Sequence, residues 1–108
     1  MTSCIFCRIV KGEVPAQVVH ETENILVFRD INPQAPVHLL AIPKRHAEGL
    51  MEIADLAGEI VGAICEAARI AGLSDYRIVL NKGPQAGQEI PHLHFHVLGG
   101  RRMNWPPG

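Results

Sequence analysis

The stretch His92-Leu93-His94-Phe95-His96-Val97-Leu98 places three histidines in alternation with apolar residues. Successive side chains of a β-strand point to opposite faces, so this pattern predicts a strand with two unlike faces. The apolar face consists of Leu93, Phe95 and Val97 and would pack on a core. The other face consists of His92, His94 and His96. Because the apolar row already supplies the burial that a strand needs, the histidine row predicts a chemical site.

Four further strands and two helices are expected around this strand. Residues 17–21, 25–29, 37–43 and 76–81 have the composition of strands. Residues 55–71 repeat apolar residues with helical spacing, which predicts one long helix with Asp55 as its cap, Gly72 as its stop and Cys65 in its buried stripe. Residues 4–12 predict a short N-terminal helix. Short links between the strands favour an α+β fold, with a five-stranded antiparallel sheet and the long helix packed on one face.

Composition narrows the class of protein. The chain has 108 residues, of which 47% are hydrophobic and 19% charged, and this predicts a single globular domain over residues 1–108. A net charge of −1 gives no general attraction to nucleic acid or to membranes, and no apolar run approaches the ~20 residues that span a bilayer. Three cysteines without an export signal at the start of the chain predict reduced thiols and a cytoplasmic location. The expected partner is a small molecule.

Two chemistries could use the histidine row. Side chains two residues apart on a strand stand ~6.8 Å apart, so the outer two histidines would lie ~13 Å apart and could not readily share one zinc ion with the middle one. The alternative is a nucleophilic imidazole supported by its neighbours. His94 is the best nucleophile candidate because it has an imidazole on each side, and His96 could deliver a proton to the leaving group.

The loop before the row favours phosphorus as the electrophile. Residues 82–89 contain two glycines, whose backbone N–H groups could converge on an anion. Asp30, in a loop stiffened by two prolines, either receives the two hydroxyls of a ribose or bonds the local backbone. Cys4 and Cys7 form a C-x2-C pair, which is either half of a zinc site or two small buried hydrophobic residues. Trp105, in an extended proline-rich tail, needs a surface to cover, such as a second subunit.

The chain resembles the histidine triad family over nearly its whole length. The resemblance rests on the histidine row, on Asp-Ile-Asn-Pro-Gln-Ala-Pro-Val-His at residues 30–38, on residues 81–89 and on the ending Arg-Met-Asn-Trp-Pro-Pro-Gly at residues 102–108. These other stretches are similar to the histidine triad nucleotide-binding protein branch. The resemblance implies a homodimer in which two five-stranded sheets join into one ten-stranded sheet. It also implies a nucleoside phosphoramidase, which splits the P–N bond of a purine nucleoside monophosphate linked to an amine.

The same resemblance implies roles for individual residues. His94 would attack phosphorus and carry the nucleotidyl group until water releases it. His96 would contact the phosphate and assist the leaving group, while His92 and His38 would orient the nucleophile. Glu89 stands where many animal members carry a serine that helps to protonate the leaving amine, so it either acts as an acid when protonated or binds a cationic amine. The implied nucleotide-binding residues are Asp30, Ile31 (through its backbone), Asn81, Gly87, Gln88, Glu89, His94, His96 and Trp105, the last near the partner subunit's site.

The resemblance also extends to a metal. Some bacterial members bind zinc through a C-x2-C pair, a histidine after the third strand and the first histidine of the triad, and here those positions are Cys4, Cys7, His46 and His92. Two sulfur and two nitrogen ligands suit a tetrahedral structural zinc ion. Catalysis itself requires no cofactor in this interpretation.

Two other functions compete with the phosphoramidase. One is a diadenosine polyphosphate hydrolase, although that branch lacks the Trp-Pro-Pro tail. The other is a nucleotide-binding regulatory dimer that uses the same pocket with little turnover.

Overall fold

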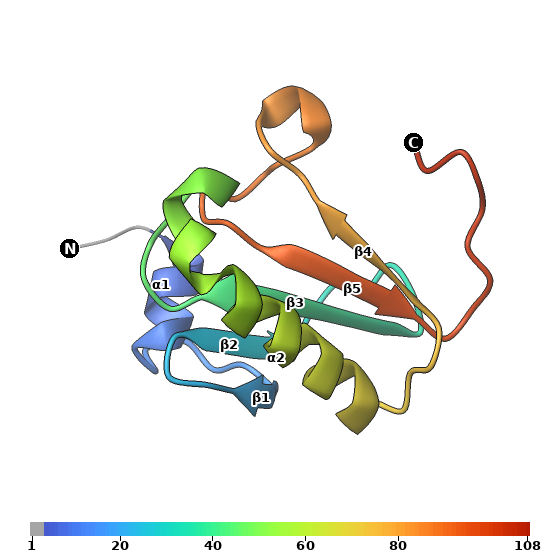
Figure 1. Cartoon of the computed structure of the whole chain (residues 1–108), viewed down its shortest axis with the longest axis horizontal. Helices are drawn as coiled ribbons and strands as arrows, with labels where there is room; N and C mark the ends of the chain where they lie inside the picture. The colour runs from blue at the N-terminus through green and yellow to red at the C-terminus, as the bar shows by residue number, and fades with distance from the viewer. Residues whose placement is uncertain (1–3) are drawn as a thin grey trace.

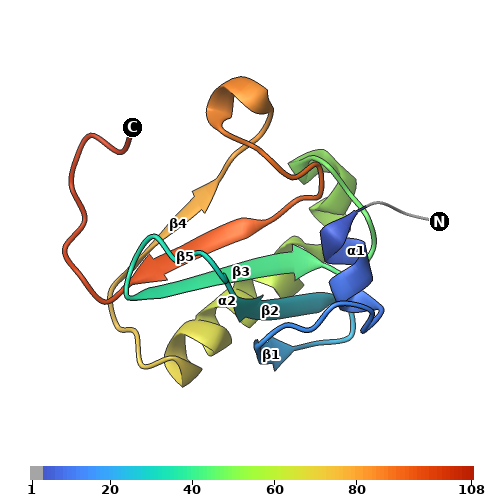
Figure 2. The same cartoon turned by 180° about the vertical axis from the view of Figure 1, so that it is seen from behind.

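The computed structural model describes residues 4–108, so Met1, Thr2 and Ser3, on which the expectation of no export signal partly rests, lie outside the described residues. The described chain forms a five-stranded antiparallel sheet with a long helix and a short N-terminal helix (Figures 1 and 2), which confirms the expected α+β fold. No helix in this range has both the length and the apolar composition needed to cross a membrane. The elements in chain order are α1 (Ile5–Val10), β1 (Val18–Glu21), β2 (Ile25–Arg29), β3 (Val37–Pro43), the 3₁₀ helix η1 (Leu50–Leu56), α2 (Ala57–Ile70), β4 (Tyr76–Leu80), the 3₁₀ turn η2 (Pro84–Ala86) and β5 (Phe95–Gly99).

The strand order is β1-β2-β3-β5-β4, which leaves β1 and β4 at the two edges. The long connection through α2 allows β5 to insert between β3 and β4. In the β3–β5 pairing, His38 lies opposite Leu98 and Leu40 lies opposite His96. Because opposed and alternate residues share a face, this register puts His38 and His96 on the same side of the sheet.

The sheet is covered on both faces, and this explains why its central strands are mostly apolar. On one face, Ile25, Val27, Leu39 and Val97 pack against the inner side of α2 in the main core. On the other face, a smaller core beneath α1 consists of Phe6, Leu26, Phe28, Leu40 and Ile42. Figure 1 shows α2 in front of the sheet, and Figure 2 shows α1 on the opposite side.

The histidine row keeps its alternation, although the strand is shorter than expected. β5 begins only at Phe95, so the first two histidines precede the strand. Two hydrogen bonds divert this part of the backbone from regular pairing: the Leu93 N–H donates to Ala47 O at 2.6 Å, and the carbonyl oxygen of His92 accepts from the His94 ring at 2.8 Å. Leu93 still packs in the main core with Val97, which places the histidines on the α1 side.

The long helix differs from its expected form in two respects. Its α-helical part begins at Ala57, and Asp55 does not cap it, because the Asp55 carboxylate pairs with Arg45 at 2.5 Å. Cys65 is exposed rather than buried, since it lies one turn after the exposed Val61 on the outer flank of the helix. The expected stop at Gly72 is confirmed: it adopts φ +79°, and its N–H donates to Arg69 O at 3.0 Å.

Candidate active site and metal cluster

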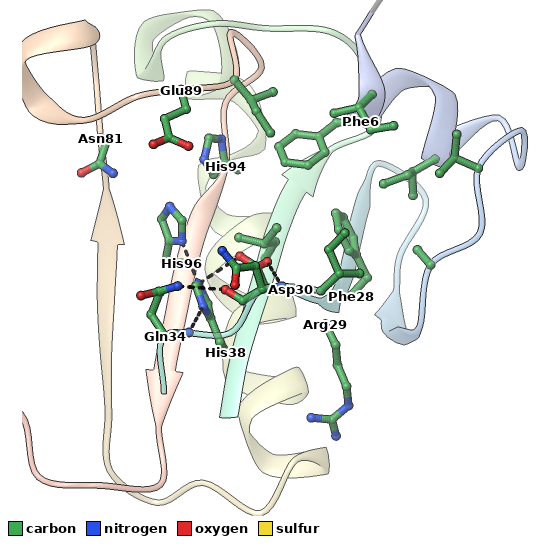
Figure 3. A pocket seen from close by; sticks show the side chains of 18 of the residues that line it. Phe6, Phe28, Arg29, Asp30, Gln34, His38, Asn81, Glu89, His94 and His96 are labelled. Atoms are coloured by element: carbon green, nitrogen blue, oxygen red, sulfur yellow. Dashed lines mark hydrogen bonds and ion pairs between the residues drawn. The ribbon is translucent and has the colours of Figure 1, made fainter. Parts of the chain in front are cut away.

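A pocket of about 590 Å³ lies on the α1 side of the sheet (Figure 3). Its apolar part is lined by Ile5, Phe6, Ile9, Val14, Phe28 and Leu40. Its polar part is lined by Asp30, His38, Asn81, Glu89, His94 and His96. A cavity of this size, with one apolar wall and a few convergent polar groups, suits a small molecule that has a flat apolar part and a polar or charged part.

His94 presents a free nitrogen lone pair to the pocket. Its Nδ1 lies 2.8 Å from the carbonyl oxygen of His92. A carbonyl oxygen can only accept, so Nδ1 must carry the proton, and Nε2 of the neutral ring keeps its lone pair. The ring is buried, packs edge-on against Phe6 with centroids 5.2 Å apart, and lines the pocket. Nε2 is therefore the nitrogen of His94 through which the expected nucleophilic attack would take place.

His38 and His96 form a directed chain of hydrogen bonds. The Gln34 backbone N–H donates to Nδ1 of His38 at 3.0 Å, so the proton of this neutral ring lies on Nε2. Nε2 lies 2.8 Å from Nδ1 of His96 and can donate to it, which leaves the His96 proton on Nε2. His96 thus offers the pocket a hydrogen-bond donor beside His94, whose ring centroid is 4.9 Å away. Of these two adjacent rings, His94 presents a nitrogen lone pair to the pocket and His96 presents an N–H.

Burial keeps these supporting rings neutral. Burial lowers the pKa of His96 to about 4, and repulsion from His94 and His38 adds to this effect. Burial also lowers the pKa of His38, although the charge of Asp30 opposes the change. At neutral pH both rings therefore hold a single proton, as the directed chain requires.

Asp30 bonds the local backbone, which was one of its two expected roles, while its expected role toward ribose hydroxyls stays a prediction. One carboxylate oxygen, Oδ1, accepts the Asn32 N–H at 2.8 Å and closes the local turn. The other oxygen, Oδ2, lies 3.5 Å from Nε2 of His38, and the residue lines the pocket. The neighbouring Ile31 also lines the pocket and is 97% exposed, so it forms part of the rim.

The glycine-containing loop does not supply the converging amides that we expected. The N–H groups of Ala86, Gly87 and Gln88 donate to carbonyl oxygens inside the loop, and the Gly83 N–H donates to the side chain of Gln88 at 2.8 Å. This expectation is wrong for these four amides, because the compact 3₁₀ turn uses them internally. The two ends of the loop instead bring Asn81 and Glu89 to the pocket that His94 lines, with Glu89 the nearer of the two to His94 (Figure 3).

Two residues implied as nucleotide ligands do not line the pocket. Gln88 holds the loop together, since its amide also donates to Ile90 O at 3.2 Å. Trp105 is 80% exposed and stacks beneath the Arg77 guanidinium, 5.9 Å from the ring centroid. Figure 2 shows the C-terminal tail running past the β4 side of the sheet.

A second cluster joins Cys4, Cys7, His46 and His92, whose ligand atoms all lie within 4.8 Å of one another. Nδ1 of His92 lies 3.3 Å from the Cys4 sulfur and 3.5 Å from the Cys7 sulfur, and Nδ1 of His46 lies 3.4 Å from Cys7. The sulfur–nitrogen edge of a tetrahedral zinc site is about 3.6 Å, from Zn–S and Zn–N bonds of ~2.3 and ~2.05 Å. The cluster therefore fits a tetrahedral zinc ion.

The protonation of the cluster agrees with this fit. Nε2 of His92 lies 2.9 Å from Pro43 O, so it carries the proton and leaves the Nδ1 lone pair facing the sulfurs. Burial is the main cause that raises the pKa of the Cys7 thiol, and its contact with the adjacent Cys4 sulfur raises this pKa further. A divalent cation would offset that cost of forming thiolates. The outer two histidines of the row thus belong to separate clusters, one with the cysteines and one with Asp30 and His38.

Sequence reasoning missed several groups that shape this site. The orienting acceptors and donor are backbone atoms, His92 O, Pro43 O and Gln34 N–H, which have no side-chain signature. Phe6 was also missed, although its position between two cysteines on a short helix could have suggested it. Gln34 lies between the two prolines of the quoted loop, so only its neighbourhood was indicated.

Comparison with known proteins gives a consistent result. Residues 11–103 match the HIT domain family. The "14 kDa zinc-binding protein" of Zea mays is 49% identical over 96% of this chain and 87% of its own length. The crystal structure of a HIT family hydrolase from Legionella pneumophila Philadelphia 1 superposes with a TM-score of 0.91 at 48% identity, covering 98% of this chain and 100% of that one. That of a histidine triad nucleotide-binding protein from Candida albicans has a TM-score of 0.86 at 34% identity, covering 96% of this chain and 83% of that one.

Proposed function

The chain belongs to the HIT, or histidine triad, family, and from that membership we propose that it hydrolyses purine nucleoside 5′-phosphoramidates through a nucleotidyl-His94 intermediate. The observation that carries the proposal is the opposite polarity of the two adjacent rings: His94 presents the Nε2 lone pair, and His96 presents an N–H. A family relative described as a nucleotide-binding protein and another described as a hydrolase support the substrate and reaction classes.

The two parts of the pocket match the parts of a nucleotide. The base would lie against the apolar wall formed by α1 and Phe28. The ribose hydroxyls would bond to Asp30, whose Oδ2 is not used in the local turn, and Ile31 would cover the sugar from the rim. The phosphate would then lie among Asn81, His94 and His96.

The chemistry proceeds in two displacements at phosphorus. In the first, Nε2 of His94 forms a bond to phosphorus, the P–N bond breaks, and its electron pair stays on nitrogen, which takes one proton and leaves as the amine. The His96 Nε2–H bonds to the phosphoryl group and stabilises its developing charge. Because His96 is neutral at neutral pH, the proton that the leaving nitrogen takes comes from solvent. In the second displacement, water attacks phosphorus and loses one proton to solvent. The bond between phosphorus and Nε2 of His94 breaks with its electron pair on Nε2, which regenerates the neutral ring and releases the nucleoside monophosphate.

The metal cluster has a structural role in this proposal. Cys4, Cys7, His46 and His92 would hold a zinc ion, which supplies a crosslink between α1 and the segment that follows β3. No catalytic step passes through it.

We further propose that the functional unit is a homodimer built on the free edge of β4. Within residues 4–108 this strand pairs only with β5. Its residues Tyr76 and Ile78 lie on the α2 face of the sheet and are exposed, and the Tyr76 hydroxyl lies 3.9 Å from the sulfur of the exposed Cys65 of α2. An unpaired edge next to an apolar patch is a typical surface for a two-fold sheet extension. Such a pairing would give the ten-stranded sheet and bring the tail of one subunit toward the other.

The decisive experiment is a rapid quench without acid after mixing the protein with adenosine 5′-phosphoramidate. Intact-mass analysis should show one adenylyl group added to the chain, located on His94 by peptide mapping. The His94→Ala chain should show neither the adduct nor turnover above the uncatalysed rate. Full turnover by this variant would refute the assignment.

Parallel assays separate the competing functions. Faster cleavage of a diadenosine polyphosphate than of the phosphoramidate at equal concentration would favour the polyphosphate hydrolase. Tight binding of AMP with turnover no better than that of His94→Ala would instead favour a regulatory nucleotide-binding dimer.

A further inference from the structure

The short helix α1 belongs to both the metal cluster and the pocket. Cys4 caps its start and Cys7 lies within it, whereas Ile5, Phe6 and Ile9 of the same helix line the pocket. A helix of six residues has little stability of its own and depends on what it packs against. Whatever fixes the two cysteines therefore also fixes the apolar wall of the pocket.

Phe6 connects the cluster to the candidate nucleophile. Its ring contacts His92 and His94 edge-on, with centroids 5.7 and 5.2 Å away, and it also packs on Phe28 at 5.7 Å. Phe6 is buried and stands between the two cysteines in the sequence. A shift of α1 would consequently move the ring against which His94 packs, which makes Phe6 a positioning residue.

His92 provides a second connection through its own backbone. Its side chain is 0% exposed and directs Nδ1 at the sulfurs of Cys4 and Cys7, while its carbonyl oxygen accepts the Nδ1–H of His94. One residue therefore carries both a metal-ligand atom and the atom that sets the tautomer of the nucleophile. Since a buried ring in a close-packed site cannot move alone, its position and that of its carbonyl are linked.

We propose that metal binding at Cys4, Cys7, His46 and His92 and nucleotide binding in the pocket are positively coupled, through α1 with Phe6 and through the His92 backbone. Zinc fixes the wall and the acceptor that the nucleotide needs, and a bound nucleotide holds the cysteines close to the two histidines. The coupling is reciprocal, so each ligand must strengthen the binding of the other by the same factor. This inference rests on the proposed function in taking a nucleoside monophosphate as the ligand of the pocket.

The test measures two affinities on the full chain. Isothermal titration gives the affinity for AMP of the zinc-loaded and chelator-stripped proteins, and a chromophoric chelator gives the zinc affinity with and without saturating AMP. We expect both affinities to change by the same factor, roughly tenfold, within the usual 5- to 150-fold range of such couplings. A mixture of AMP, zinc and chelator without protein corrects for zinc held by the nucleotide. Far-UV circular dichroism verifies that the stripped protein keeps its sheet.

Should the stripped protein lose its sheet, His46→Ala provides a second route. His46 is exposed and lies outside the pocket lining, so its loss weakens the metal site while both cysteines remain on α1. The AMP affinity of this variant should still rise as zinc is added, at higher zinc concentrations than in the wild type.

Phe6→Leu examines the proposed connection, with Ile9→Val as the matched control that trims the same wall one turn further along α1. The factor by which zinc changes AMP affinity should fall to less than half in Phe6→Leu and persist in Ile9→Val. An undiminished factor in Phe6→Leu would overturn the role of Phe6. AMP binding that is equal with and without zinc would overturn the coupling, whereas no AMP binding in either form would overturn the proposed function instead.

Discussion

The buried histidines should make the folded chain sensitive to mild acid, and His96 allows the effect to be calculated. Its pKa is lowered to about 4, mainly by burial, whereas in the unfolded chain it is near 6.5. As the pH falls through 6.5, the unfolded state takes up a proton that the folded state cannot accept until about pH 4. The stability associated with the neutral ring is therefore complete above pH 6.5 and is lost progressively between pH 6.5 and pH 4.

The size of the effect follows from the difference between the two pKa values. That difference corresponds to about 3 kcal/mol once the pH is below both values, at 1.36 kcal/mol for each pKa unit. At pH 5 the unfolded ring is almost fully protonated and the folded ring is almost fully neutral, so about 2 kcal/mol of unfolding free energy should already be lost relative to pH 8. His38, whose pKa is lowered in the same direction, adds to the loss in the wild type.

Urea unfolding of the wild type and of His96→Asn at pH 8 and pH 5 isolates this contribution. The asparagine keeps an acceptor for the Nε2–H of His38 but does not titrate. At pH 8 the two free energies of unfolding differ only by the packing cost of the substitution. Between pH 8 and pH 5 the wild type should lose about 2 kcal/mol more than the variant. Parallel losses, within about 0.5 kcal/mol, would show that His96 is not held neutral by its surroundings.

Three further predictions concern substrate and assembly. Glu89→Gln should reduce the preference, measured as the ratio of kcat/KM values, for a diamine phosphoramidate over a monoamine phosphoramidate of equal length. The expected reduction is only roughly two- to fivefold, because Glu89 is exposed at the pocket and its attraction to a cationic amine is screened by solvent. An unchanged ratio would show that Glu89 does not take part in amine recognition. Asp30→Asn should raise KM for the ribonucleotide substrate about 10- to 100-fold yet change it less than ~3-fold for the 2′,3′-dideoxy analogue, as expected for charge-assisted bonds to the hydroxyls. If the proposed dimer forms through β4, Ile78→Lys should make the chain monomeric by light scattering. Val18→Lys, which is exposed on the opposite edge strand, should leave the measured mass unchanged.

The fold could be predicted largely because its elements differ in period. The mostly apolar run of Val37–Pro43, with His38 as its one polar residue, and the helical repeat in α2 have distinct signatures. The bounds of both elements agree with the sequence prediction to within a few residues. The errors arose where tertiary contacts override local preference. Asp55 is a good cap in isolation, but Arg45 offers its carboxylate a stronger partner, and the position of Cys65 relative to the sheet depends on how α2 is rotated.

The sequence indicated which side chains make up the candidate site, but it did not indicate which nitrogen of each histidine ring carries the proton. The spacing of Cys4 and Cys7 indicated half of a metal site, but the other half depends on β3 and β5 being neighbours. The glycine loop was misjudged because composition does not reveal that a 3₁₀ turn uses its own amides. Backbone partners such as Pro43 O are invisible in the sequence, yet they decide which nitrogen of each ring is free.

The main chain thus gives chemically identical side chains different roles. Pro43 O holds the proton of His92 on Nε2, so Nδ1 faces the cysteines; His92 O holds the proton of His94 on Nδ1, so Nε2 faces the pocket. The Gln34 N–H reaches His96 through His38 and leaves its proton on Nε2. A regular strand would have committed its carbonyl oxygens to the ladder and left no acceptor for the middle ring. The late start of β5 is therefore what frees His92 O to orient His94. It also explains why one segment both carries the candidate metal ligand His92 and orients the proposed nucleophile His94.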